Sequence, residues 1–249
     1  MASFTPTVSA HHTTTSRRRN SDLPPGAGGG GNGRRPDPGL PDSGTRLRRA
    51  RLGLGAALIP ILMLFVAFTS AYIVRQGLPT LDPSTNKVVH DWIPVQLPTA
   101  LFLVNTGVLL LSSVTIELAR RQLARRIALE PVASIPGVSL GEDRKLPWLG
   151  ITIVLGLCFL TGQWLAWSDL ASRGFFVATG PSSSFVYLLT GTHAVHLLGG
   201  VVALLVAGST VVLRRPLESR RIVVDVTAWY WHFMALLWIY ILMLLEFVP

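Results

Sequence analysis

Three histidines and one glutamine stand inside long apolar stretches, where a polar side chain is costly and is therefore a candidate for function. His193 and His196 are three residues apart in TGTHAVH, so on a helix they share one face. His232 lies in AWYWHF, and Gln163 lies in TGQWLAW. Histidines inside a membrane suggest two kinds of chemistry, the ligation of haem and the binding of a metal ion.

The number and surroundings of these histidines favour neither kind of chemistry, although one metal ion bound by all three is geometrically conceivable. Two haems with paired histidine ligands need facing pairs on separate helices, and only three histidines lie in the apolar stretches. A single metal held by His193, His196 and His232 would have no carboxylate at membrane depth to act as a ligand or to orient one. We therefore expect no cofactor and no metal in this chain, and histidines that hydrogen-bond between helices or contact lipid.

The acidic residues do not suggest proton transfer through this chain. Asp169, Asp225 and Glu246 lie toward the ends of the apolar stretches, whereas a proton relay or a transporter needs an acid at depth. The motifs of serine hydrolases, P-loop proteins and zinc metalloproteases are missing, and the single cysteine, Cys158, has no partner for a metal or redox motif. The isolated chain is predicted to have no catalytic centre.

The elements that carry these residues are predicted to be membrane-spanning helices. Of the 249 residues, 49% are hydrophobic and 14% are charged, and the mean hydropathy is +0.47. Soluble domains are roughly a quarter charged. Five apolar runs are each long enough to cross a hydrocarbon core, which needs about 20 residues. The predicted fold class is an all-α integral membrane protein, a five-transmembrane-helix bundle. The runs are Leu52 to Val74, Leu97 to Leu118, Leu149 to Trp167, Ser184 to Leu213 and Val223 to Val248.

Lysine and arginine are distributed unevenly about these spans. Nineteen lie on the N-terminal side of the bundle and three on the opposite side. Lysine and arginine are enriched in the cytoplasmic loops of membrane proteins. The N-terminus is therefore predicted to be cytoplasmic and the C-terminus periplasmic or extracellular. This sidedness explains the net charge of +9 without a nucleic-acid partner. Residues 1–50, rich in Ser, Thr, Gly, Pro and Arg, are predicted to be a disordered cytoplasmic tail, and residues 51–249 the five-helix membrane domain.

Small and aromatic residues indicate where the helices meet. Small residues recur at intervals of four in the fourth apolar run, and such residues let neighbouring backbones approach closely. They are Gly199, Ala203 and Ala207, with Gly200 beside the first. Trp229, Tyr230 and Trp231 lie about a third of the way into the fifth run, where their polar atoms would seek partners within the bundle or at a lipid head group.

Taken together, the motifs resemble one family, subunit III of cytochrome c oxidase and the related haem-copper terminal oxidases. The run W-Y-W-H-F with a later Trp238 is similar to the last helix of that family, and TGTHAVHLLGG to the helix before it. The second run carries a similar Asn-Thr and Ser-Ser-x-Thr pattern, and Gln163 matches a third-span glutamine. The resemblance covers about residues 52 to 248, and five spans resemble the shorter bacterial form of the subunit. The pattern residues of the second run are Asn105, Thr106, Ser112, Ser113 and Thr115; those of the fourth are Ser184, Phe185, Thr190, Gly191, His193, His196 and Gly200.

The resemblance implies a non-redox subunit in the bacterial inner membrane. It would pack directly against subunit I, which holds haem and copper, in a complex that also contains subunit II and reduces oxygen while pumping protons. It would stabilise subunit I, support proton uptake and bind phospholipid. Asn105, Gln163 and the histidine and aromatic residues above would then be interhelical or lipid contacts, and the Gly199 to Ala207 face a packing surface.

Two substitutions weigh against a direct part in proton collection. The long form of the family has a glutamate in the span where this chain has Ile61, and an aspartate often follows W-Y-W-H-F where this chain has Ala235. Three alternatives stay open: an accessory protein of nitric oxide reductase, subunit III of a quinol oxidase, and a transporter or small membrane enzyme. The last would need a polar cavity within this chain alone.

Overall fold

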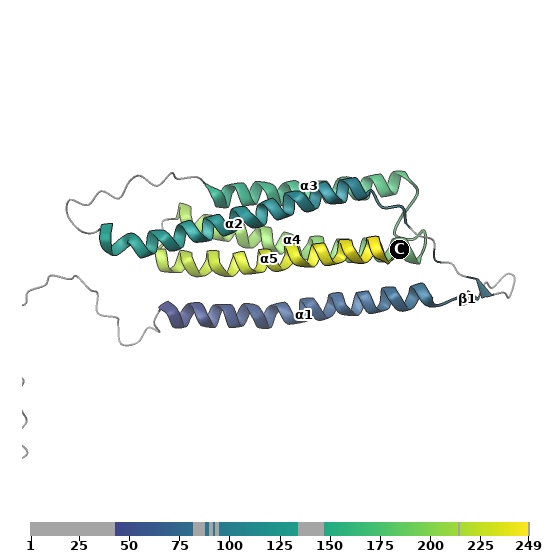
Figure 1. Ribbon diagram of the computed structural model, residues 1–249, viewed down its shortest axis with the longest axis horizontal. Helices are drawn as coiled ribbons and strands as arrows, with labels where there is room; N and C mark the ends of the chain where they lie inside the picture. The colour runs from purple at the N-terminus through teal and green to yellow at the C-terminus, as the bar shows by residue number, and fades with distance from the viewer. Residues whose placement is uncertain are drawn as a thin grey trace, which may run out of the picture. The chain divides into compact units, whose positions relative to one another are not determined.

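The computed structural model describes residues 43–81, 88–89, 92, 95–133, 147–213 and 215–248, all of which belong to one compact unit, Pro41–Pro249. Most of the predicted disordered tail, residues 1–42, lies outside the described residues. The described part is almost entirely helical, which confirms the predicted fold class (Figure 1). The five helices are α1 (Ser43–Gly77), α2 (Thr99–Ala133), α3 (Trp148–Ser172), α4 (Pro181–Val212) and α5 (Leu217–Phe247).

All five helices are long and apolar enough to cross a membrane, as the apolar runs predict. Each helix extends beyond its predicted run at one end or both, and the extensions are longest in three of them: α1 begins at Ser43 rather than Leu52, α2 continues to Ala133, and α5 begins at Leu217. The first of these corrects the predicted boundary at residue 50, since eight residues assigned to the tail are helical. Between α1 and α2, strands β1 (Thr80–Leu81) and β2 (Val88–Val89) pair antiparallel.

Helix α5 is the centre of the bundle. It packs against α1, α2 and α4, and half of its most apolar segment is buried. The other packed pairs are α2 with α3, α3 with α4, and α1 with α4. Helix α1 lies along one side of the bundle in Figure 1, and only 11% of its most apolar segment is buried. Most of the α1 surface therefore faces outward, toward lipid or another chain.

The core forms where bulky rings meet glycines. Trp231 of α5 is completely buried, and its ring lies against Gly156 of α3 and Gly200 of α4. A Cβ atom at Gly156 would lie 2.8 Å from Trp231 Cη2, so only glycine fits opposite this ring. Trp238, two turns further along α5, packs edge-on against Phe159 and Phe102. These contacts hold α2, α3 and α4 around α5.

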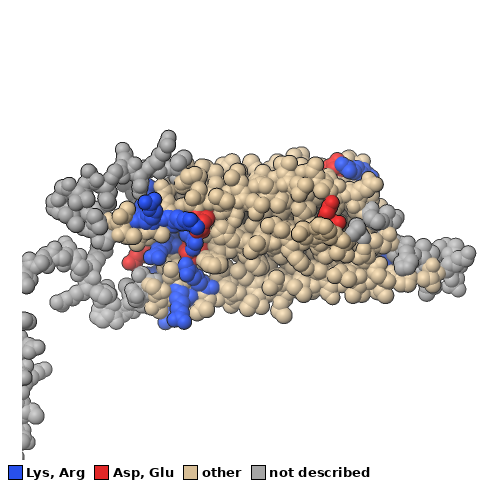
Figure 2. All heavy atoms as spheres, viewed as in Figure 1, with Lys and Arg blue, Asp and Glu red and all other residues tan. Residues whose placement is uncertain are grey.

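Charge is concentrated at the end of the bundle where α1 and α5 begin and α2 ends. Figure 2 shows the blue arginine spheres gathered there, with few charged residues at the opposite end. Among the described residues, that opposite end carries Arg75 and Arg173. We call the arginine-rich end the basic end of the bundle.

Candidate functional site

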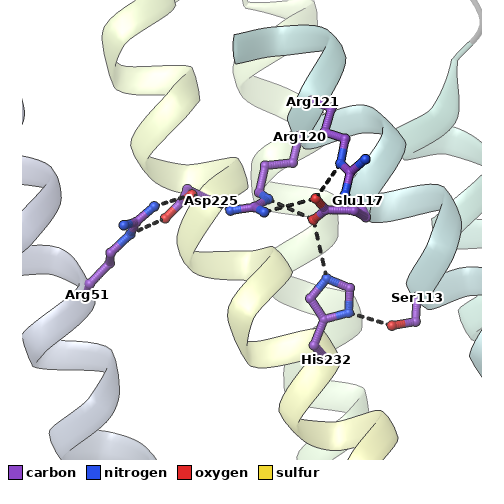
Figure 3. A network of polar contacts seen from close by, with 7 residues as sticks. All are labelled: Arg51, Ser113, Glu117, Arg120, Arg121, Asp225 and His232. Atoms are coloured by element: carbon purple, nitrogen blue, oxygen red, sulfur yellow. Dashed lines mark hydrogen bonds and ion pairs between the residues drawn. The ribbon is translucent and has the colours of Figure 1, made fainter.

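A buried carboxylate joins three helices at the basic end. Asp225 of α5, whose side chain is 7% exposed, receives a two-pronged hydrogen bond from Arg51 of α1: Nε to Oδ2 at 2.7 Å and Nη2 to Oδ1 at 2.8 Å. Arg120 of α2 donates from Nη1 to Asp225 Oδ1 at 3.2 Å. Figure 3 shows the two guanidinium groups on either side of the carboxylate. Because paired arginine nitrogens match the geometry of a carboxylate, this contact fixes the relative position of α1 and α5.

A second carboxylate extends this arrangement along α2. Glu117 accepts hydrogen bonds from Arg120 Nε at 2.8 Å and Arg121 Nε at 2.8 Å, because residues three and four apart share a helix face. His232 of α5 places its Nε2 atom 3.6 Å from Glu117 Oε2, and its Nδ1 atom contacts the hydroxyl of Ser113. The seven residues drawn in Figure 3 form one network, which we call the arginine–carboxylate network: Arg51, Ser113, Glu117, Arg120, Arg121, Asp225 and His232.

The network is arranged to hold helices together. Each of its two carboxylates accepts hydrogen bonds from two arginines, Asp225 from Arg51 and Arg120 and Glu117 from Arg120 and Arg121. Among the described residues, no group of three or more His, Cys, Asp or Glu residues could hold a metal ion. Below the network, an apolar groove of about 440 Å³ runs between α2 and α5 beside His232 and opens outward. The chemistry here is electrostatic pairing beside an apolar surface.

Sequence reasoning misses most of this network. Of its members, only His232 is a predicted site residue, and Asp225 is noted merely as lying near a span end. Glu117 stands near the end of the second apolar run, and its spacing to Arg120 and Arg121 predicts ion pairs on one helix face. That signal could have identified Glu117. Sequence reasoning does not consider Glu117 as a neighbour of a histidine, yet its Oε2 atom lies 3.6 Å from His232 Nε2.

The two histidines of α4 have different surroundings, although they share a helix face. His193 is completely buried, between the rings of Phe159 and Trp238, and neither ring nitrogen has a hydrogen-bond partner among the described residues. His196 places Nδ1 2.8 Å from the carbonyl oxygen of Thr192 in its own helix. The structure thus keeps His232 in the arginine–carboxylate network and His193 in the core, so the three histidines do not form one site.

The predicted polar contacts of α2 and α3 lie in the core. Asn105 of α2 is buried and donates from Nδ2 to the carbonyl oxygen of Phe159 at 3.2 Å, which joins α2 to α3. Its side chain fills the space beside Gly162. Gln163 is 1% exposed, and neither of its amide atoms has a partner among the described residues.

The three adjacent aromatic residues of α5 point in different directions. Trp229 is 51% exposed on the outside of the bundle. Tyr230 donates a hydrogen bond from its hydroxyl to the carbonyl oxygen of His196 at 2.8 Å. Trp231 donates from Nε1 to the hydroxyl of Ser112 at 2.9 Å. Tyr230 and Trp231 therefore join α5 to α4 and α2, whereas about half of the surface of Trp229 faces the surroundings of the bundle.

The small residues of α4 divide between the interior and the surface. Gly200 and Ala207 are buried, and a Cβ atom at Gly200 would lie 3.1 Å from Tyr230 Cε1. Gly199 is exposed, and Ala203 is half-buried. The packing surface of α4 therefore centres on Gly200 and Ala207, not on Gly199.

Comparison with known proteins gives a consistent picture. The sequence model of the family described as cytochrome c oxidase subunit III matches residues 45–248. A probable cytochrome c oxidase subunit 3 from Mycobacterium leprae is 31% identical over 103 residues, which cover 41% of this chain and 50% of that protein. The cytochrome c oxidase subunit 3 of Branchiostoma lanceolatum is 28% identical over 195 residues, which cover 77% and 66%. That of Chondrus crispus is 26% identical over 197 residues, which cover 77% and 64%. The chain thus spans half to two thirds of the length of these curated relatives.

Proposed function

The chain belongs to the cytochrome c oxidase subunit III family and is a multi-pass membrane protein, and from this premise we propose that it is the non-redox subunit III of a haem-copper terminal oxidase. In this proposal it binds directly to subunit I, which carries haem and copper, in an assembly that includes subunit II. The complex oxidises a donor, reduces oxygen to water and moves protons across a bacterial inner membrane. This chain contributes no catalytic centre to that reaction.

The observation that carries the proposal is the family match over all five spans, joined to side chains that are used for packing and pairing. The carboxylates of the arginine–carboxylate network are engaged by arginines, and the two buried tryptophans Trp231 and Trp238 donate hydrogen bonds to hydroxyl groups of α2. These residues build a rigid bundle. Such a bundle suits a subunit that stabilises a neighbour during turnover.

The apolar outer surface supports a role within a larger assembly. Helix α1 presents a series of large exposed side chains, among them Leu62, Met63 and Val66. We propose that subunit I covers part of the bundle surface, with phospholipid filling the grooves that remain. The basic end would face the cytoplasm, with the C-terminus on the other side, and the chain would support proton uptake by stabilising subunit I on that side.

The first test is to purify the tagged full chain from its native membrane and identify what comes with it. We expect subunits I and II in constant ratio, with the absorption bands of haem carried by the assembly. The chain separated from its partners should show no visible absorption band. A band from the separated chain, or turnover of a substrate by it alone, would refute the proposal.

A second test replaces His232 with alanine in the intact complex. This change removes the contact of α5 with Ser113 and Glu117, so we expect weaker assembly or faster loss of oxidase activity during turnover. The haem content of each purified complex should stay nearly unchanged. The control is Thr161→Ala, since this exposed hydroxyl bonds only within its own helix, to the carbonyl oxygen of Leu157. Loss of haem in proportion to loss of activity would contradict a purely stabilising role.

A further inference from the structure

A pocket at the basic end lies beside the arginine–carboxylate network and is lined by arginines but by no described carboxylate. It has a volume of about 310 Å³ and lies where α2 ends, α3 begins, α4 ends and α5 begins. Its lining is mostly apolar, with Leu123, Trp148, Leu149 and Val224 among the side chains. We call it the four-helix pocket.

The cations of the four-helix pocket have no counterion among the residues that the structure describes. Arg126 of α2 and Arg220 of α5 line it, and neither forms an ion pair with a described residue. The Nε atom of Arg220 is buried without a hydrogen-bond partner among the described residues. The described residues that line the pocket include no carboxylate, whereas the neighbouring pocket that holds Arg51 and Arg120 also holds Glu117 and Asp225. A buried guanidinium nitrogen without a partner is costly, so the pocket favours an anion.

The start of α3 adds to the positive potential of the four-helix pocket. Trp148 and Leu149 are the first residues of α3 and line the pocket, so the backbone N–H groups of this helix end lie beside it. No acidic residue occurs in the first turn, and Pro147 at the N-cap position provides no side-chain hydrogen bond. Helix N-termini attract negative charge through these unpaired N–H groups. Two arginines and a helix N-terminus therefore converge on one cavity.

The geometry points to an anionic phospholipid in the four-helix pocket, with its phosphate between Arg126 and Arg220 and its glycerol and upper acyl carbons against Leu123, Leu149 and Val224. The mostly apolar lining fits an amphiphile better than a free ion, because an apolar wall provides no hydrogen bonds to a hydrated anion. Because the five helices are long and apolar enough to cross a bilayer, we expect their basic end at the level of the lipid head groups, where anionic lipids are attracted to basic surfaces. This inference rests on the proposed function and adds to it a defined class of lipid and a defined site. The experiment that tests it does not depend on whether the proposed function is correct.

The experiment uses the full chain in detergent and counts bound lipid by native mass spectrometry during titration with phosphatidylglycerol or phosphatidylcholine. We expect phosphatidylglycerol to bind more tightly to the wild-type chain. In Arg126→Gln/Arg220→Gln, its apparent Kd should rise about tenfold, as expected for the loss of charge-assisted hydrogen bonds worth ~1.4 kcal/mol. The matched control Arg125→Gln/Arg215→Gln removes the same charge at two exposed positions outside the pocket and should change the Kd by less than about twofold.

Several results would overturn this inference. Equal losses in the two double variants would mean that only overall charge matters, and displacement of the lipid by inorganic phosphate would indicate a free-anion site. If the pocket variant does not fold, the wild-type chain can be cross-linked with photoactivatable phosphatidylglycerol instead, and the cross-linked residues locate the bound lipid. Cross-links at Trp148 or Leu149 support the site, and cross-links elsewhere alone refute it. Because the assay needs no partner subunit, failure leaves the proposed oxidase role untouched.

Discussion

The contact between Arg51 and Asp225 is predicted to be a principal attachment of α1 to the bundle. These residues are 174 positions apart and join the first and last helices. A double-mutant cycle with Arg51→Gln, Asp225→Asn and the double variant isolates their interaction energy. Asparagine keeps the size of the side chain and one acceptor oxygen while it removes the charge.

The expected magnitude follows from the exposure of the two side chains. Removing one partner of a buried ion pair costs about 3–5 kcal/mol, and an exposed pair contributes about 0–1 kcal/mol. The Asp225 side chain is 7% exposed and that of Arg51 is 45% exposed, so solvent screens one side of the pair. Arg120 also remains to neutralise Asp225 when Arg51 is replaced. We therefore expect an interaction energy of about 1–2 kcal/mol, between these limits.

The assay is the reversible unfolding of the full chain in mixed micelles, followed by tryptophan fluorescence, for the wild type and three variants. The control is the equivalent cycle for Asp169 and Arg173, which pair at 2.8 Å within the end of α3. These side chains are 36% and 44% exposed, so the control interaction should stay below about 0.5 kcal/mol. An interaction energy for Arg51 and Asp225 no larger than that of the control would refute the reasoning.

Two further predictions test the core around α5 in the same unfolding assay. Gly200→Ala should destabilise the chain by about 1–3 kcal/mol because its Cβ atom meets the ring of Tyr230 at 3.1 Å, whereas Gly199→Ala, whose Cβ atom has only ordinary contacts, should not. A stable Gly200→Ala protein would show that these rings can shift. Trp231→Phe should cost about 1–3 kcal/mol through the lost hydrogen bond to a serine of α2, while Trp229→Phe at a 51% exposed position should change the stability by less than about 0.5 kcal/mol. Equal effects of the two tryptophan changes would contradict the described orientation of α5.

Hydropathy predicts the number and order of the spans but not where each helix ends. An apolar run indicates which residues lie in the hydrocarbon core of the bilayer. The helix can continue beyond that core with polar residues. Helix α2 continues past Leu118 through Arg120 and Arg121, where ion pairs to Glu117 stabilise the helix from its own surface. The same holds at the start of α1, where Ser43 to Arg51 is helical although its arginines exclude it from the apolar run.

The candidate site could be predicted only in part, because its members come from distant parts of the chain. The unusual polar residues of the apolar runs are visible in sequence, as His193 and Gln163 show. That Arg51 meets Asp225 depends on the docking of α1 beside α5, which no local pattern reports. Orientation about the helix axis is equally hidden, since Trp229, Tyr230 and Trp231 are adjacent in sequence and face different surroundings.

The central position of α5 has a consequence for biogenesis. A ribosome delivers this helix after the other four, yet it packs against three of them. Among the described helices α1 packs only against α4 and α5, so the nascent α1 has no helix of its own chain to pack against until α4 has been made. Quality-control proteases should therefore recognise chains truncated before α5 as unassembled.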